Sequence, residues 1–367
     1  MGNWEYYNPV RVWSGRNHLT ALPIILPRGN ILLLSSKGTT IRGTNAKIIA
    51  VLGAERVTIN DSTCANPDLD ALDDLISSLQ EQTFSAIVAV GGGSVIDSAK
   101  VLGVCLAKDE ERPLDRILRG GVKQNWGQGI PVFAIPTTSG TGAEVTPFAT
   151  VWDFRDKKKF SVFGDAVFPS QALLDPSLLV SLPMELTLFT GLDAISHALE
   201  SLWNKNRTPV SSSFALAALD KSVESFPRVL SNPDDLLMRA EMQDAAVLGG
   251  FAISQGRTAL AHSISYPLTL HHHMPHGLAC SFTLTALLRI PGIKEGLPEH
   301  SLALCLKTAD MLDSLGIPNF VSRYANLDEM LRLIPEMSTK ARSDNFSLDV
   351  SHELIADVLH SATKDKR

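Results

Sequence analysis

The stretch around which the chain is organised reads Gly191-Leu-Asp-Ala-Ile-Ser-His-Ala-Leu-Glu200, and it spaces Asp193 and His197 four residues apart. Side chains at this spacing lie on one face of a helix, so a carboxylate and an imidazole here can bind one ion. Further along the chain, His262 and His276 add two nitrogen donors. One oxygen and three nitrogen ligands suit a divalent transition metal, because calcium and magnesium prefer oxygen and structural zinc sites more often use thiolates. The pattern therefore predicts a metal centre; for Asp193 and His197 alone, a solvated helix pair is the alternative.

A glycine-rich loop between a predicted strand and a predicted helix indicates a phosphate-binding site. The apolar run 84–90 predicts a buried strand, Gly91-Gly-Gly-Ser94 follows it, and residues 95–106 have helical periodicity. Glycines have no Cβ to keep a phosphate away from the backbone, and the amides that open a helix attract anions. A second small, hydroxyl-rich loop, 136–144, follows the predicted strand 131–135. Such loops at the carboxyl ends of neighbouring parallel strands line one crevice, so we expect a nucleotide there, with plain surface turns as the alternative.

The order of the predicted elements divides the chain in two. Short apolar runs typical of parallel strands fill the first half, and from Pro183 onward one helical pattern follows another. We therefore predict an α/β nucleotide-binding domain over residues 1–181 and an all-helical metal-binding domain over 182–367. The predicted strands are 11–14, 30–35, 56–59, 148–152, 160–163 and 172–176, and the predicted helices are 68–80, 215–226, 236–251, 256–270, 284–288 and 301–315.

Composition excludes several classes of protein. The chain has 367 residues, 44% hydrophobic and 20% charged, which is ordinary for a globular protein. A net charge of −6, with no basic block longer than 157–159, argues against a nucleic-acid partner. No apolar run approaches the roughly 20 residues of a membrane span, and the first residues do not resemble an export signal. The four cysteines are far apart and form no CxxC pair, so we expect buried thiols in a reducing compartment and a cytoplasmic protein.

Four ordered motifs resemble those of the iron-dependent (group III) alcohol dehydrogenase family: 91–100, 135–146, 191–200 and 262–276. The resemblance implies a Rossmann-like N-terminal domain and an all-helical metal-binding domain, the dehydroquinate synthase-like fold. It also implies Fe(II) as the metal, with Zn(II) in some relatives. The implied metal ligands are Asp193, His197, His262 and His276.

The same resemblance implies a nicotinamide dinucleotide. Many members carry an aspartate at the end of the second strand, where its charge and bulk repel a 2′-phosphate. This chain has a small hydroxyl there, Ser36, with Lys37 and Arg42 nearby, which favours NADP(H) over NAD(H). The alternative is that Ser36 hydrogen-bonds a ribose hydroxyl. The other implied contacts are Asn66, Gly92, Gly93, Ser94, Thr137, Thr138, Thr141 and Lys159, with Asp97 and Lys100 in the same glycine motif.

A second departure concerns proton transfer. Many relatives have a histidine four residues after the third metal ligand, and this chain has Tyr266 there. We expect Tyr266 or His271 to serve as the catalytic proton relay. For His272 and His273 the alternative is a polar, partly exposed loop.

The implied activity is the reversible NAD(P)H-linked reduction of a small aldehyde to a primary alcohol, with the metal acting as a Lewis acid. The sequence around the metal residues, 262–269 and 274–279, resembles the phosphonoacetaldehyde reductase (hydroxyethylphosphonate dehydrogenase) branch of the family. That likeness implies an anionic substrate, with Lys205, Arg207 and Arg257 as candidate cations; solvated helix ends are the alternative for each. The family also implies a homo-oligomer, such as a dimer.

Other activities remain open at this point. Within the enzymes, a maleylacetate reductase and a glycerol-type or general alcohol dehydrogenase are the nearest alternatives. A dehydroquinate-synthase-like lyase is a more distant one, because that fold shares the glycine motif and the metal residues. A nucleotide-binding scaffold without activity is the alternative from another class of protein.

Overall fold

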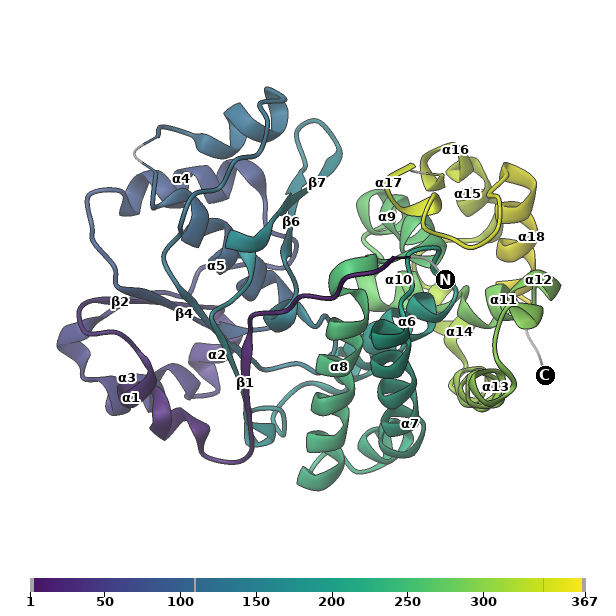
Figure 1. Cartoon of the computed structure of the whole chain (residues 1–367), viewed down its shortest axis with the longest axis horizontal. Coiled ribbons are helices and arrows are strands. Elements are labelled where there is room, and N and C mark those ends of the chain that lie inside the picture. The colour runs from purple at the N-terminus through teal and green to yellow at the C-terminus, as the bar shows by residue number, and fades with distance from the viewer. Residues whose placement is uncertain (1–2, 109, 339, 365–367) are drawn as a thin grey trace. The chain divides into compact units, whose positions relative to one another are not determined.

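The computed structural model describes residues 3–108, 110–338 and 340–364. It separates into two compact units, which we describe one at a time with the labels of Figure 1. The sheet unit consists of Asn8–Thr138 and Ala143–Leu182. The helical unit consists of the described parts of Met1–Tyr7, Ser139–Gly142 and Pro183–Arg367. The boundary that we predicted near residue 181 stays a prediction.

The sheet unit is built on six parallel strands in the order β1-β8-β5-β4-β2-β3, with a separate antiparallel pair, β6 and β7. This arrangement confirms the expected Rossmann-like α/β fold of the N-terminal half. Its strands are β1 (Arg11–Ser14), β2 (Ile31–Ser35), β3 (Val57–Asn60), β4 (Ala86–Gly91), β5 (Val132–Pro136), β6 (Phe148–Asp153), β7 (Lys158–Phe163) and β8 (Gln171–Leu174). Its helices are α1 (Leu22–Ile25), α2 (Lys37–Ile41), α3 (Thr44–Leu52), α4 (Leu69–Leu79) and α5 (Gly93–Cys105).

Both faces of this sheet are buried, which explains why its strands are continuous apolar runs in the sequence. Along β2, Leu32 and Leu34 pack into the core beneath α4 and α5. The alternate residues, Ile31 and Leu33, pack into the core beneath α1 and α3. The two sets of helices lie on opposite faces of the sheet (Figure 1).

The strand order creates one point at which the chain changes direction across the sheet. After β2 the chain forms β3 on one side of it and then crosses to form β4 on the other side. Open α/β sheets bind ligands at the carboxyl ends of the strands at such a switch point. The loop after β4 lies beside the loop after β5. Gly91 pairs with Pro136, and the Thr137 amide donates to the Gly91 carbonyl at 2.9 Å.

The helical unit confirms the expected all-α second half. Its helices share one hydrophobic core that includes the fully buried Trp203, Phe226 and Phe346. None of the helices in the described residues is long and apolar enough to span a membrane. The helices are α6 (Met184–Leu202), α7 (Pro209–Ser231), α8 (Leu236–Gly256), α9 (Leu260–His272), α10 (His276–Ser281), α11 (Leu284–Leu288), α12 (Pro291–Glu295), α13 (Glu299–Ser314), α14 (Ile317–Val321), α15 (Leu327–Arg332), α16 (Ile334–Met337), α17 (Lys340–Ser343) and α18 (His352–Ala362).

One predicted helix and one predicted burial are wrong. The segment 256–270 is not a single helix, because α8 ends at Gly256 and Arg257 has φ 60° and ψ −174°. The Asn204 side-chain amide donates to the carbonyls of Gly256 and Arg257, at 3.1 Å each, and so stabilises this break. Cys64 is exposed, whereas the other three cysteines are buried as expected.

Candidate metal centre

The four predicted metal ligands belong to the helical unit, and two of them lie on the buried face of α6. Asp193 and His197 are one turn apart, and both side chains are almost fully buried. The Nε2 atom of His197 lies 3.5 Å from Oδ1 of Asp193. The i, i+4 spacing read from the sequence therefore places both groups on one side of one helix.

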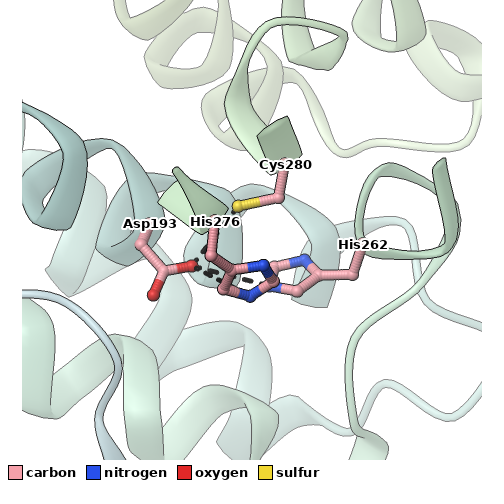
Figure 2. A group of neighbouring side chains, drawn as sticks. All are labelled: Asp193, His262, His276 and Cys280. Atoms are coloured by element: carbon pink, nitrogen blue, oxygen red, sulfur yellow. Dashed lines mark hydrogen bonds and ion pairs between the residues drawn. The ribbon is translucent and has the colours of Figure 1, made fainter. Parts of the chain in front are cut away.

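The other two histidines reach the same carboxylate oxygen from α9 and α10. The Nε2 atoms of His262 and His276 lie 3.6 and 4.0 Å from Oδ1 of Asp193. Two ligand atoms that are each about 2.1 Å from a tetrahedral metal are about 3.4 Å apart. The observed separations are close to that value, and Figure 2 shows His262 and His276 directed toward Asp193. All three imidazoles thus lie within 4.0 Å of one carboxylate oxygen, whereas the residues whose ligand atoms all lie within 4.8 Å of one another are Asp193, His262, His276 and Cys280, without His197.

A divalent cation fits this cluster by charge and by hydrogen bonding. The Nε2 atom of His262 is buried and has no hydrogen-bond partner among the residues that the structure describes, so a metal would satisfy an otherwise unpaired atom. Burial opposes ionisation of Asp193, but the neighbouring imidazoles, His197 first, hold the pKa of that carboxyl well below its usual range. Burial lowers the pKa of His197 to about 4, against the effect of Asp193. A carboxylate and a neutral imidazole are the protonation states that bind metals.

Glu200, whose role the sequence did not indicate, supports the cluster from the same helix. Its Oε2 atom lies 2.5 Å from Nδ1 of His262, and its Oε1 atom accepts from the Ala261 amide at 2.6 Å. The side chain is fully buried. Histidines that bind metals usually donate their second ring N–H to a carboxylate, which fixes the tautomer and directs the other nitrogen at the metal. A glutamate three residues after His197 was the available signal, but its partner is 62 residues away.

Cys280 is a second residue that the sequence did not single out. Its Sγ atom lies 3.3 Å from Oδ1 of Asp193, and the thiol lies beside His262 and His276 (Figure 2). Burial raises the pKa of this thiol to about 11. Cys280 follows His276 by four residues on α10, so it lies on the same helix face as a metal-site residue.

A glycine explains how α10 comes so close to α6. A Cβ on Gly277 would lie 1.8 Å from the carbonyl oxygen of Phe189 and 3.2 Å from Cβ of Asp193. Only a residue without a side chain fits at this contact. Gly277 thereby allows the neighbouring His276 to approach Asp193.

The two candidate proton relays have different surroundings. Tyr266 is half-buried with its hydroxyl oxygen buried, and its ring is nearly parallel to that of His276, with 6.3 Å between the centroids. His271 is exposed at the end of α9, with its Nε2 atom 2.8 Å from a carboxylate oxygen of Glu336. Tyr266 is therefore the candidate that contacts the metal-site residues.

The three candidate cations also differ. Lys205 and Arg207 are exposed, and Arg207 donates to the Gly296 carbonyl at 3.4 Å. Arg257 is half-buried, and burial lowers the pKa of its guanidinium. Of the three, Arg257 alone has the partly desolvated setting in which a charge interacts strongly with an anion.

In the sheet unit, the glycine motif opens α5 as expected. Gly92 is the N-cap of that helix, and a Cβ on Gly91 would lie 2.5 Å from the Val95 side chain. The Ser94 hydroxyl accepts from the Asn66 amide at 3.2 Å, which joins the loop before α4 to the phosphate loop. Thr137 and Thr138 follow β5, and Thr138 is the residue that a Cβ on Gly92 would meet.

Asp97 and Lys100 hold α5 against the neighbouring strand. The Lys100 ammonium is buried and donates to Oγ1 of Thr146 at 3.1 Å and to the Phe148 carbonyl at 2.9 Å. Asp97 accepts from the Thr150 amide at 2.8 Å. Burial lowers the pKa of Lys100 to about 8, partly opposed by the charge of Asp97. The contacts of both residues therefore fix the helix whose first turn faces the predicted phosphate.

The predicted coenzyme-selecting position contains an acid that the sequence did not indicate. Ser36 caps α2 and accepts from the Thr39 amide at 3.4 Å. Beside it, Nζ of Lys37 lies 2.5 Å from Oδ1 of Asp61, which follows β3. Lys37 is thus not a lone cation, and burial lowers the pKa of Arg42, which is the second cation here.

The last two predicted nucleotide contacts, Lys159 and Thr141, belong to other segments of the chain. The Lys159 ammonium lies 5.0 Å from the ring centroid of Trp152, on the β6–β7 pair. Thr141 belongs to the short segment Ser139–Gly142 that is counted with the helical unit.

Two family models match almost the whole chain. The model described as iron-containing alcohol dehydrogenase matches residues 9–176. The model described as the C-terminal part of the Fe-containing alcohol dehydrogenase family matches residues 187–363.

Individual relatives in the sequence comparison match a smaller part of the chain. A phosphonoacetaldehyde reductase from Streptomyces viridochromogenes is 40% identical over 55% of this chain, and an NAD-dependent methanol dehydrogenase from Bacillus methanolicus is 35% identical over 63% of it. These matches span only 52% and 62% of the relatives' own lengths. Among solved structures, a sulfoacetaldehyde reductase from Bifidobacterium kashiwanohense, in complex with NAD+, has the same fold, with a TM-score of 0.85, 23% identity and 99% of both chains covered.

Proposed function

The chain belongs to the iron-containing alcohol dehydrogenase family, and from this premise we propose that it catalyses the reversible reduction of a small aldehyde to a primary alcohol by NAD(P)H. The proposal depends on one observation: the Nε2 atoms of three histidines lie 3.5 to 4.0 Å from one carboxylate oxygen of Asp193. When bound there, a divalent metal supplies Lewis-acid polarisation of the carbonyl oxygen, and the nicotinamide supplies hydride.

The residues of the chain have three tasks in this reaction. Asp193, His197, His262 and His276 would hold the metal, and Glu200 keeps the Nδ1 proton of His262 in place so that Nε2 remains a ligand. Tyr266 would carry the proton between the alcohol oxygen and bulk water, because its ring lies against His276. We prefer it to His271, whose Nε2 atom is beside Glu336.

Fe(II) is the metal that we propose, in keeping with the family's description. One oxygen and three imidazoles also suit Zn(II), and the neighbouring thiol of Cys280 would favour it further. Restoring a chelated sample with each metal separately, and measuring both occupancy and turnover, decides between them.

NADP(H) is the coenzyme that we propose. Support comes from the small hydroxyl of Ser36 and from Arg42 beside it. Asp61 opposes the preference, because it accepts from Lys37 at 2.5 Å and adds negative charge where a 2′-phosphate would bind.

Ser36→Asp tests this preference without damaging the helix, because aspartate is also a good N-cap. We expect the ratio of kcat/KM for NADPH to that for NADH to fall at least tenfold. Ser351→Asp is the matched control, since Ser351 caps α18 in the same way. An unchanged ratio in Ser36→Asp would mean that this position does not contact the coenzyme.

The substrate that we propose is a two-carbon aldehyde with an anionic tail, such as phosphonoacetaldehyde. Two relatives are named for reductases of such aldehydes, one phosphono- and one sulfoacetaldehyde. Arg257 is the predicted cation whose half-buried position suits this role. The proposal further includes a cytoplasmic location and a homodimer, and light scattering on the purified protein tests the latter.

His262→Ala is the main test of the function. We expect turnover to be lost and bound metal to fall, while NADPH binding, measured by fluorescence, remains near the wild-type value. His300→Ala removes an exposed histidine of α13 and should change none of the three. Normal turnover in His262→Ala would exclude the metal mechanism, and turnover without net oxidation of NADPH would indicate a lyase.

A further inference from the structure

Arg342, which the sequence did not indicate, lies next to Tyr266, the candidate proton relay. Its Cζ atom is 5.3 Å from the centroid of the Tyr266 ring, and its Nη1 atom donates to the Thr258 hydroxyl. The Tyr266 ring is in turn stacked with that of His276, at 6.3 Å and 13°. The Arg342 guanidinium thus packs on the Tyr266 ring, which in turn packs on the imidazole of the predicted metal ligand His276.

Arg257 brings a second positive charge to the same place. It precedes Thr258, the residue to which Arg342 donates. Burial lowers the pKa of Arg257, and the charge of Arg342 lowers it further, so the two guanidiniums are near enough to repel one another. Like charges that are partly removed from water are costly unless an anion lies between them. The side-chain contacts of Arg342 within the described part of the chain are with Thr258 and Tyr266, and neither is a carboxylate.

The backbone at Arg257 supplies an independent observation. Its φ of 60° and ψ of −174° belong to a region that is essentially restricted to glycine. The structure maintains this conformation through Asn204, whose side chain donates to the carbonyls on both sides. Backbone strain in a non-glycine residue occurs mostly at functional sites, where the side chain must occupy a set position.

We infer that Arg257 and Arg342 form the anion-binding part of the substrate site, where they hold the tetrahedral anionic group of the aldehyde. This inference rests on the proposed function, and it adds the residues that select the substrate class. Each guanidinium presents a planar pair of N–H donors. A phosphonate or sulfonate has three oxygens and can accept from both forks at once.

The test compares anionic and neutral aldehydes of similar length. Phosphonoacetaldehyde, sulfoacetaldehyde and butanal are assayed as substrates of the metal-loaded enzyme and of the variants Arg257→Gly and Arg342→Met. Each variant should lower kcat/KM for the anionic aldehydes about 10- to 150-fold, mainly through KM, because a hydrogen bond to a charged group is lost. With butanal, kcat/KM should stay within threefold of wild type. Arg228→Met removes an exposed arginine of α7 as a matched control and should leave all three values unchanged.

Arg257→Gly separates a binding role from a structural one. Glycine adopts this backbone conformation without strain, so the variant should unfold at the same or a higher temperature than wild type while it loses its preference for anions. If Arg257 were only structural, its loss would lower the melting temperature. Comparing kcat/KM for phosphonoacetaldehyde with kcat/KM for sulfoacetaldehyde then shows which anionic group the two arginines prefer.

A binding measurement keeps the inference separable from the proposed function. Ethylphosphonate, titrated calorimetrically into the wild-type protein, should bind at least tenfold more tightly than to either arginine variant. If wild type reduces no aldehyde yet shows this difference, the proposed function fails and the anion subsite stands. Equal ethylphosphonate binding, or an unchanged ratio of anionic to neutral kcat/KM in both variants, would overturn the inference.

Discussion

Replacing Glu200 by glutamine should weaken metal binding without displacing any metal ligand. Glu200 uses one carboxylate oxygen for the backbone amides of Ala261 and His262, at 2.6 and 3.4 Å, and the other for the His262 ring, at 2.5 Å. Glutamine has the same shape but only one oxygen. If that oxygen keeps the backbone amides, the amide nitrogen faces the Nδ1–H of His262, and two donors then oppose each other.

The expected loss can be given a magnitude. To relieve the conflict, His262 moves its proton to Nε2, which can then no longer bind a metal until the ring is forced back. Loss of such a supporting partner typically costs 10- to 100-fold in metal affinity, or about 1.4 to 2.8 kcal/mol. The charge balance points the same way. Asp193 and Glu200 together match a divalent cation, whereas the variant leaves one positive charge uncompensated in a buried place.

The assay is a competition titration of Zn(II) or Co(II) against a chromogenic chelator, with far-UV circular dichroism to confirm folding. Glu241→Gln is the control, because Glu241 lies on the adjacent α8 and pairs with Lys221 at the surface. Its metal affinity should equal that of wild type. If folded Glu200→Gln binds metal within twofold of wild type, the reasoning that links Glu200 to the centre is refuted.

Three further predictions concern other parts of the chain. Alkylation followed by mass spectrometry should label the exposed Cys64 first and Cys280 only after unfolding, because burial raises the pKa of the Cys280 thiol to about 11; equal labelling rates would contradict its burial. Gly277→Ala should lower the free energy of unfolding in urea by about 1–3 kcal/mol and should reduce metal content, since the new Cβ would lie 1.8 Å from a backbone oxygen of α6; normal metal binding would show that α10 can shift freely. Burial raises the pKa of Glu144 from 4.5 to about 7, so the folded state binds this proton more tightly than the unfolded one, and stability should fall by about 2 kcal/mol as pH rises from about 5 to 7. Glu144→Gln should flatten that decline in urea titrations, and an unchanged slope would mean that another group causes it.

Features with a local sequence signature were predictable. The runs that became β2 and β4 are apolar because both faces of their sheet are covered, and the glycines after β4 precede a helix as a phosphate loop requires. The i, i+4 spacing of Asp193 and His197 also depends only on one helix. Each of these signals comes from residues that are neighbours in the chain.

Features that depend on distant contacts were not predictable. Glu200 stands in the same helix as two proposed ligands, but its role follows from a contact with His262. The proposed role of Arg342 follows from its contact with the Tyr266 ring, and Tyr266 is 76 positions earlier in the sequence. The end of α8 was missed for a similar reason, because the residue that stabilises the turn at Arg257 is Asn204. No pattern around any of these residues indicates its partner.

The way the chain is divided between its two units limits how they can be exchanged. Ser139–Gly142 is counted with the helices although it lies within the sequence of the sheet unit. Gly142 packs so tightly on Gly250 that a Cβ on it would lie 2.4 Å from the Gly250 Cα atom. A fragment that starts at Pro183 would lack Gly142 and so lose this contact with Gly250 on α8. A chimaera that takes the helices from a relative must therefore also take that relative's counterpart of Ser139–Gly142. A single crossover near Pro183 would combine this segment of one protein with the helix of another.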